Sequence, residues 1–329
     1  MVSPAADAAG RGGVLDAVAD ALGARATRHA PLGPRTTYRV GGRAGVLVEA
    51  HAEDDLVAVH HALASVGASV PLLVLGEGSN LLVADAGFPG LVVRLGEGFD
   101  WVEISSSGVR AGAGAKLPVV ARRTAAAGLH GLEWGVGVPG SVGGALKMNA
   151  GGHGSDVAAV LVRHRRFDLV TGAGVDAGPA PLALGYRSSS LQAGDVVVWA
   201  EFSLRPGDRA RAEETVAEVV RWRRENQPGG SNAGSVFVNP TGDSAGRLVE
   251  AAGLKGLRMG TAQVSPKHAN FIQADAGGSA DDVWRLIRHV RAEVLGRTGV
   301  ALVPEVRMVG FPGDDDDGQP STSSGGRGL

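Results

Sequence analysis

The chain has 329 residues, 44% hydrophobic and 20% charged, a composition typical of globular proteins with sizeable cores. Its formal net charge of −2 gives no basic footprint for nucleic acid. Because there is no cysteine, disulfides, thiolate metal sites, iron–sulfur clusters, cysteine nucleophiles and cysteinyl-flavin links are excluded. Glycine is abundant at 52 residues and aromatic residues are few at 4%, which favours backbone turns close to a ligand over a base-stacking surface.

We expect both ends of the chain to be disordered. Residues 1–13 are rich in Ala, Gly and Pro, and residues 313–329 are acidic and then rich in Ser and Gly, so neither has much to bury. The N-terminus lacks the charged and apolar regions of a signal peptide, and no apolar run reaches the roughly 18 residues of a membrane span. These features fit a cytoplasmic protein that contacts no membrane.

The first half of the chain alternates between helical and strand patterns. Helices are predicted over 14–23, 52–67 and 117–129, and strands over 44–50 and 71–76. The helix over 52–67 has acids in its first turn, where the helix dipole favours them. Residues 91–115 are punctuated by glycine and predict a meander of strands.

The second half continues the mixture and contains a break. Strands are predicted over 157–170, 195–204, 235–240, 268–274 and 301–309, and helices over 211–226, 244–254 and 279–299. The last of these helices has Ser279 as its N-cap and acids in its first turn. The "QPGG" break at 227–230 marks a candidate domain boundary. The mixture of helices and strands on both sides of it predicts the α+β fold class.

Three glycine-rich segments could present backbone N–H groups to a phosphate: 75–82, 110–117 and 135–154. "GEGSNL" and "GAGAKL" have leucine where the dinucleotide-binding fingerprint needs its third glycine. In "GSVGGALK", leucine precedes Lys147 and no Ser or Thr follows, so a P-loop is not supported either. The segment 110–117 fits a plain turn, whereas 135–154 is long enough to wrap a pyrophosphate.

Six ordered segments resemble one enzyme family. They are "LGEGSNLL" (75–82), "GLHGLEWGVGVPGSVGGALKMNAGGHG" (128–154), "YRSS" (186–189), "QPGGSNAGSVFVNP" (227–240), "VSPKHANFIQA" (264–274) and "LVPEVR" (302–307). Together they are similar to the UDP-N-acetylenolpyruvoylglucosamine reductases, also called UDP-N-acetylmuramate dehydrogenases, of peptidoglycan precursor synthesis. The resemblance covers about residues 14–310.

The resemblance implies a two-part FAD-binding region of the vanillyl-alcohol-oxidase-like flavin fold, followed by an α+β substrate-binding domain. We expect FAD-binding subdomain 1 over 14–76, subdomain 2 over 77–227 and 299–312, and the substrate-binding domain over 228–298. The chain after "YRSS" is too short for the tyrosine-bearing substrate lid of one branch, so it resembles the lid-less branch.

FAD would be held noncovalently, with its pyrophosphate on two glycine-rich loops. The implied FAD-binding residues are Gly76, Glu77, Gly78, Ser79, Asn80, Leu81, Gly140, Ser141, Gly144, Ala145, Asn149, Ala150 and Gly151. The segment "PRTTYRVGG" (34–42) is similar to an early family element but has Thr36 where Asn is usual.

The implied reaction transfers hydride from NADPH to flavin N5 and then from N5 to C3 of the enolpyruvyl ether, while a proton reaches C2. Charge builds on C2 and the adjacent carboxylate, so a cation, a second stabilising group and a proton donor are needed. Arg187 fits the first role, because a guanidinium binds carboxylate bidentately and stays charged. Glu305 fits the second, although strand alternation alone fits a water-facing side chain equally well.

Ser235 fits a turn serine by its local sequence, since Gly and Ser punctuate strands everywhere. Its place in the matching segment makes it the implied proton donor to C2, with Gly234 leaving room for the substrate. The three implied catalytic residues are therefore Arg187, Ser235 and Glu305.

Tyr186 and Asn239 are the implied substrate-binding residues, and Val238 stands where many relatives have lysine. Arg221, Arg223 and Arg224 could bind a diphosphate instead, or could simply be a basic helix C-terminus. No metal ligands are expected: His60 and His61 are adjacent rather than four residues apart.

The expected partner is a small sugar nucleotide bound to a monomer, with neither nucleic acid nor membrane. Two alternatives stay open: a flavin oxidase of the same superfamily, and a non-catalytic flavin- or sugar-nucleotide-binding protein.

Overall fold

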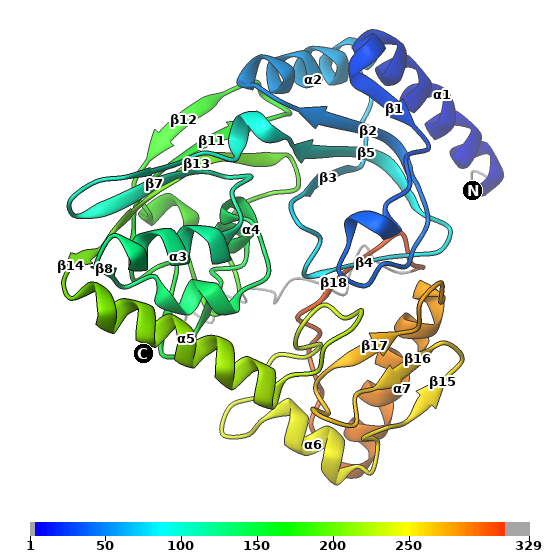
Figure 1. The fold of residues 1–329 in the computed structure, drawn as a ribbon. Coiled ribbons are helices and arrows are strands. Elements are labelled where there is room, and N and C mark those ends of the chain that lie inside the picture. The colour runs from blue at the N-terminus through cyan, green and yellow to red at the C-terminus, as the bar shows by residue number, and fades with distance from the viewer. Residues whose placement is uncertain (1–3, 313–329) are drawn as a thin grey trace, which may run out of the picture.

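A computed structural model describes residues 4–312, and these form three parts arranged around a central region (Figure 1). The first helix, α1 (Pro4–Leu22), begins near the N-terminus. Residues 4–13, expected to be disordered, are therefore helical, and the expectation is corrected there. The four alanines of this segment favour a helix, and they outweigh its three glycines, Gly10, Gly12 and Gly13. The expected acidic tail, 313–329, lies outside the described residues.

The first part is a four-stranded sheet covered by α1 and α2 (Glu53–Val66) (Figure 1). Its strand order is β1 (Ala26–Arg28), β2 (Ala44–Ala50), β5 (Phe88–Leu95), β3 (Leu72–Leu75). Strands β2 and β3 both pair with β5 in parallel.

Strand β5 corrects two expectations. It joins the first sheet instead of a meander, so the boundary expected after residue 76 falls inside that sheet's sequence. Leu91, Val92 and Val93 are all buried, as is typical of a central parallel strand covered on both faces. Because apolar and polar residues do not alternate in such a run, the sequence does not indicate which strands pair with it.

The second part is a five-stranded antiparallel sheet with α3 (Leu117–Ala126) and α4 (Val142–Lys147) packed on it. Its order is β12 (Gly174–Ala177), β11 (Leu161–Asp168), β13 (Asp195–Ser203), β7 (Gly108–Gly112), β6 (Val102–Ile104). Helix α5 (Arg209–Asn226) packs through Val219 against Ala121 and Val136. Two short ladders complete this part: β8 (Leu129–His130) with β14 (Arg205–Pro206), and β9 (Gly151–Gly152) with β10 (Ser155–Asp156).

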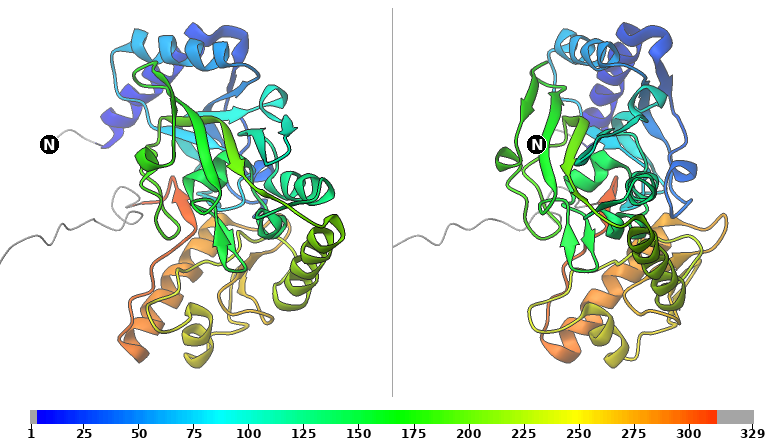
Figure 2. Two further views of the ribbon diagram at one scale, coloured as in Figure 1. Left: turned by 90° about the vertical axis from the view of Figure 1, so that its left-hand side faces the viewer. Right: turned by 60° about the vertical axis from the view of Figure 1, so that its left-hand side comes forward.

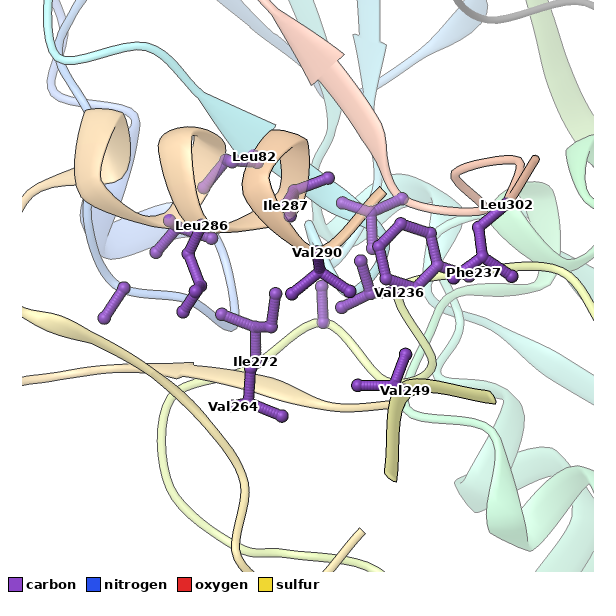
Figure 3. Close-up of a cluster of buried hydrophobic side chains, with 14 of the residues drawn as sticks. Leu82, Val236, Phe237, Val249, Val264, Ile272, Leu286, Ile287, Val290 and Leu302 are labelled. Atoms are coloured by element: carbon purple, nitrogen blue, oxygen red, sulfur yellow. The ribbon is translucent and has the colours of Figure 1, made fainter. Parts of the chain in front are cut away.

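The third part lies below the other two from every direction drawn (Figures 1 and 2). It contains α6 (Ala245–Ala251), α7 (Ala280–Thr298) and a sheet of β15 (Arg258–Met259), β16 (Ala262–Val264) and β17 (Ile272–Ala274). Its core packs α7 side chains such as Leu286 and Val290 against Val264 and Ile272 (Figure 3). Ser279 caps α7 by accepting from the Asp282 N–H, as predicted.

The predicted strand over 235–240 is not a regular strand. Phe237 makes one isolated antiparallel bridge to Pro304, and the pairing extends no further. Instead, Val236 and Phe237 point their side chains into the core of the third part (Figure 3). Residues 301–309 form a strand only at β18 (Arg307–Val309), which pairs in parallel with β4 (Leu81–Val83).

A side chain of the first half of the chain caps a helix of the third part. The Asp85 carboxylate accepts from the Ala280 N–H (2.9 Å) and the Ser279 hydroxyl (2.5 Å) at the start of α7. Since a carboxylate at a helix N-terminus satisfies free amide groups and complements the dipole, this contact holds two parts of the molecule together.

We expect Asp85→Ala to lower the free energy of unfolding by about 1–2 kcal/mol, as loss of a helix cap does. Urea unfolding of the FAD-free protein would measure it. Asp54→Ala is the control, because exposed Asp54 makes no hydrogen bond within residues 4–312. Equal effects of the two substitutions would contradict the capping role.

Candidate active site

One cavity of about 380 Å³ lies where the three parts meet. Its walls include almost all the residues implied by the sequence: Gly76, Glu77, Gly78, Ser79, Asn80, Leu81, Gly140, Ser141, Gly144, Ala145, Ala150, Gly151, Tyr186, Arg187, Ser235, Asn239 and Glu305. These residues come from segments distant in sequence, so the fold brings the predicted site together.

Asn149 is the exception. Its side chain is buried and does not line the cavity. The amide donates to the Gly185 carbonyl (2.8 Å) and to Asp156 (3.1 Å), and it accepts from the Ala158 N–H (2.9 Å). Asn149 therefore supports the turn that carries Tyr186 and Arg187 from beneath.

The loop between β3 and β4 presents free backbone amides to the cavity. Within the described chain, the N–H groups of residues 77–80 donate to no protein acceptor. Gly78 has φ of 59°, and a Cβ there would lie 2.4 Å from the Arg35 carbonyl oxygen, so only glycine fits this turn. Consecutive free amides of this kind form an anion-binding concavity.

The second glycine-rich loop faces the first one across the cavity. A Cβ on Gly140 would lie 3.1 Å from Ser79 Oγ, which shows how closely the loops approach. Ser141 caps α4 by accepting from the Gly144 N–H (3.2 Å). The two loops therefore make one narrow groove in which a diphosphate can contact backbone from both sides.

Thr36 does not enter this groove. Its hydroxyl donates to the Gly33 carbonyl (3.0 Å) and accepts from the Arg39 N–H (3.2 Å). The neighbouring Thr37 N–H donates to the Gly78 carbonyl (3.2 Å). The element with the unusual threonine thus supports the anion-binding loop from behind.

Three cations line the cavity without a carboxylate partner among the described residues. Lys147 Nζ donates to the Leu191 carbonyl, and Arg223 bonds Gln227 and the Gly137 carbonyl. The Arg307 guanidinium makes no hydrogen bond or ion pair within residues 4–312. Burial, together with the nearby charge of Arg307, lowers the pKa of Lys147 to about 8. Unpaired cations and free amides in one groove fit a polyanionic ligand such as FAD with its diphosphate.

Arg187 and Glu305 form an ion pair inside the cavity. Arg187 Nε lies 3.0 Å from Glu305 Oε1, and Arg187 Nη2 donates to the Gly151 carbonyl (2.9 Å). The two side chains are only 25% and 18% exposed. Glu305 therefore faces the cavity, and the water-facing alternative is excluded.

Opposing effects act on the pKa of Glu305, and the backbone of Arg187 has an uncommon conformation. Burial raises the pKa of the Glu305 carboxyl, and the charge and hydrogen bond of Arg187 oppose that rise. Arg187 has φ of 54°, an uncommon conformation for a side chain with a Cβ, and such outliers gather at functional sites. Tyr186 beside it is 65% exposed, with its ring 5.3 Å from the Arg187 guanidinium carbon.

Ser235 lies at the cavity wall on a glycine turn. Gly234 has φ of 79°, and the space where its Cβ would be is open. The Asn232 side chain accepts from the Gly234 N–H (3.0 Å). The Ser235 hydroxyl has no hydrogen-bond partner within residues 4–312, so it is available to a ligand.

Only some of the remaining candidate substrate-binding residues line the cavity. Asn239 lines the cavity and accepts from the Ala245 N–H at the start of α6 (3.0 Å). Of the three arginines near the end of α5, only Arg223 reaches the cavity, while Arg221 borders a separate surface hollow beside Trp222. Val238 does not line the cavity.

Two cavity cations were missed by the sequence reasoning. Arg307 follows Glu305 by two residues, and in extended chain residues i and i+2 share a face, so it could have been found. Lys147 gave no such signal, because its approach to Arg307 depends on the pairing of β4 with β18.

The comparisons with known proteins place the chain in a family. Residues 226–309 match the C-terminal domain of UDP-N-acetylenolpyruvoylglucosamine reductase, and residues 44–175 match an FAD-binding domain. UDP-N-acetylenolpyruvoylglucosamine reductase of Rubrobacter xylanophilus is 43% identical over 86% of this chain and 94% of the relative. The chain belongs to the UDP-N-acetylenolpyruvoylglucosamine reductase family. The Paramagnetospirillum magneticum reductase is similar at 42% identity over 87% of the chain and 92% of the relative.

A solved reductase structure agrees with this placement. The crystal structure of the Thermus caldophilus reductase matches with a TM-score of 0.75 and 37% identity, covering 86% of this chain and 98% of that one. The predicted fold class, a two-part FAD-binding region with an α+β substrate-binding domain, is thereby confirmed, as is FAD as cofactor. Within residues 4–312, no helix could cross a membrane, and no cluster of His, Asp and Glu could hold a metal ion.

We expect Lys147→Met to weaken FAD binding about tenfold near pH 7, equivalent to about 1.4 kcal/mol. An anion favours the protonated lysine, so wild-type affinity is full below the Lys147 pKa of about 8 and falls as the pH rises through it. Fluorescence titration of the FAD-free protein between pH 6.5 and 9.5 would measure both effects. Lys255→Met, outside the cavity, is the matched control. Parallel pH profiles for wild type and Lys147→Met would contradict this role.

Proposed function

We propose that the protein catalyses the NADPH-dependent, FAD-mediated reduction of UDP-N-acetylglucosamine-enolpyruvate to UDP-N-acetylmuramate. The observation that carries this proposal is the Arg187–Glu305 ion pair, which lies in one cavity with the unpartnered Ser235 hydroxyl and the anion-binding loops. The family membership supports the same substrate. When bound, FAD would accept hydride from NADPH and supply it to C3 of the substrate.

Arg187 would hold the enolpyruvyl carboxylate. One Arg187 N–H already bonds Glu305 and another bonds Gly151, which leaves the outer edge of the guanidinium for a bidentate contact. Negative charge that develops on C2 and the carboxylate during reduction would be stabilised by this fixed cation. Glu305 would orient the guanidinium of Arg187 and would partly balance its positive charge.

Ser235 would donate the proton that reaches C2. Its hydroxyl has no hydrogen-bond partner in the described part of the chain, and the glycine turn before it leaves open space for the substrate. A carbanion-like centre next to a positioned hydroxyl is a strong enough base to take its proton, even though serine is a weak acid in water. Solvent would then restore the hydroxyl proton.

Three other side chains would bind the sugar nucleotide. Asn239 accepts from Ala245 but keeps its amide donors for a ligand. Arg223, which lines the same cavity, would contact a phosphate of the substrate. Tyr186, which is exposed at the rim, would cover part of the substrate.

Anaerobic half-reactions would test this proposal. The FAD-loaded protein would be reduced with one equivalent of NADPH and mixed with UDP-N-acetylglucosamine-enolpyruvate. Return of the oxidised flavin absorbance, with formation of UDP-N-acetylmuramate, is expected. Flavin that stays reduced under nitrogen but reoxidises rapidly in air would instead indicate a flavin oxidase with another substrate.

A further inference from the structure

Asn270 holds the backbone that follows Ser235. Its side chain is 3% exposed, accepts from the Phe237 N–H (2.9 Å) and donates to the Phe237 carbonyl (2.8 Å). The Asn270 carbonyl also accepts from the Val236 N–H (2.8 Å). Three hydrogen bonds from one buried residue thus fix the two residues after Ser235.

The chemistry of the side chain suits this position. A primary amide offers a donor and an acceptor side by side, so it can pair with one residue's N–H and C=O as a neighbouring strand would. Among the described residues, 235–240 have no regular strand partner, and the backbone N–H and C=O groups of a buried segment need hydrogen-bond partners. The side chains of Val236 and Phe237 pack in the core around Val290 and Leu302, so the segment is anchored on both sides (Figure 3).

The hydrogen bonds of Asn270 are also connected to Glu305. The Val236 carbonyl, whose N–H is held by Asn270, accepts from the Glu305 N–H (2.8 Å), and the Val238 N–H donates to the Val303 carbonyl (2.9 Å). The Glu305 carbonyl in turn accepts from the Asn80 side chain (2.9 Å). A continuous chain of hydrogen bonds therefore links Asn270, the Ser235 turn, Glu305 and the anion-binding loop.

We propose that Asn270 is a positioning residue that sets the Ser235 hydroxyl and the Glu305 carboxylate in register, and so controls the rate of substrate reduction. This inference rests on the proposed function of Ser235. Asn270 acts through the backbone of residues 236 and 237, because it is buried and both its amide oxygen and its amide nitrogen bond Phe237. Its contribution therefore belongs to the half-reaction with the sugar nucleotide and not to the reduction of FAD by NADPH.

The test uses the FAD-loaded full chain and measures each half-reaction by anaerobic stopped flow. For Asn270→Ala we expect the maximal rate of flavin reoxidation by UDP-N-acetylglucosamine-enolpyruvate to fall about 10- to 100-fold, as displacement of a catalytic group does. The substrate concentration at half-maximal rate and the rate of reduction by NADPH should stay close to wild type. Equal slowing of both half-reactions would mean a general structural role and would overturn the proposal.

Gln273→Ala is the matched control. Gln273 is also on the segment that contains β17, and its amide also donates to a backbone carbonyl, Gly229, at 2.8 Å. That bond lies on the far side of the glycine turn from Phe237. Wild-type reoxidation by Gln273→Ala together with slow reoxidation by Asn270→Ala supports the proposal, and equal slowing by both contradicts it.

Asn270→Asp keeps the side-chain volume and the acceptor for the Phe237 N–H but loses the donor to the Phe237 carbonyl. It replaces Asn270→Ala in the test if the alanine variant fails to fold. We expect a reoxidation rate between wild type and Asn270→Ala; a wild-type rate would overturn the proposal.

A double-substitution cycle separates this inference from the proposed function. In a Ser235→Ala background, Asn270→Ala should slow reoxidation less than it does alone, because the part of its effect that passes through the Ser235 hydroxyl is already lost and only the part that passes through Glu305 is left. If Ser235→Ala is slow but Asn270→Ala is not, only the role of Asn270 is overturned. If Ser235→Ala itself reoxidises at the wild-type rate, the proposed role of Ser235 and the inference fall together.

Discussion

Ser235→Ala should slow flavin reoxidation by UDP-N-acetylglucosamine-enolpyruvate by about 10²- to 10⁴-fold, the range expected for loss of a general acid. Reduction of the flavin by NADPH should be unchanged, since no proton from Ser235 is needed there. The substitution removes one oxygen atom whose hydroxyl makes no hydrogen bond to the described chain, so the fold should be preserved. Anaerobic stopped-flow absorbance would measure both half-reactions.

Ser231→Ala is the matched control for this prediction. Ser231 lies on the same connecting segment, and its backbone bridges Ala274, but it does not line the cavity. Both half-reactions of this variant should match wild type. A Ser235→Ala protein that reoxidises as fast as Ser231→Ala would show that the proton comes from another group or from water.

The part of the site that could be predicted is the part encoded in short segments. Ser235 by itself fits a turn serine and Glu305 fits a water-facing side chain, and only the resemblance of their segments to a known family predicted a role in the site for each. The sequence did not determine which way these side chains point. A water-facing Glu305 fitted its pattern equally well, and only the approach of Arg187 to 3.0 Å decides the matter.

The fold was predictable where packing is local and not where pairing is distant. Helix α7 follows from its apolar spacing and the Ser279 cap. The partners of β5 do not follow from its sequence, because Leu91 to Val93 are buried on both faces and such runs have no period. The irregular path of residues 235–240 depends on Asn270, a residue distant in sequence whose amide replaces a strand.

Arg187→Lys should lower kcat/KM for the sugar nucleotide by about 10²- to 10³-fold, as loss of a preorganised charge-stabilising donor does. Lysine keeps the charge, but one ammonium cannot bond Glu305 and Gly151 and still grip a carboxylate bidentately. Steady-state kinetics with NADPH saturating would measure the loss.

The same substitution should also change the pH dependence of the reaction. Burial raises the pKa of Glu305 and Arg187 opposes the rise, so a weaker partner allows that pKa to climb further. Because the ionised carboxylate is the form that orients the cation, the acidic limb of the kcat/KM profile should move to higher pH in Arg187→Lys. Arg165→Lys, which alters the Glu53 ion pair outside the cavity, is the control and should leave that limb unmoved. An acidic limb at the wild-type position in Arg187→Lys would mean that the Arg187–Glu305 pair does not set the ionisation on which substrate reduction depends.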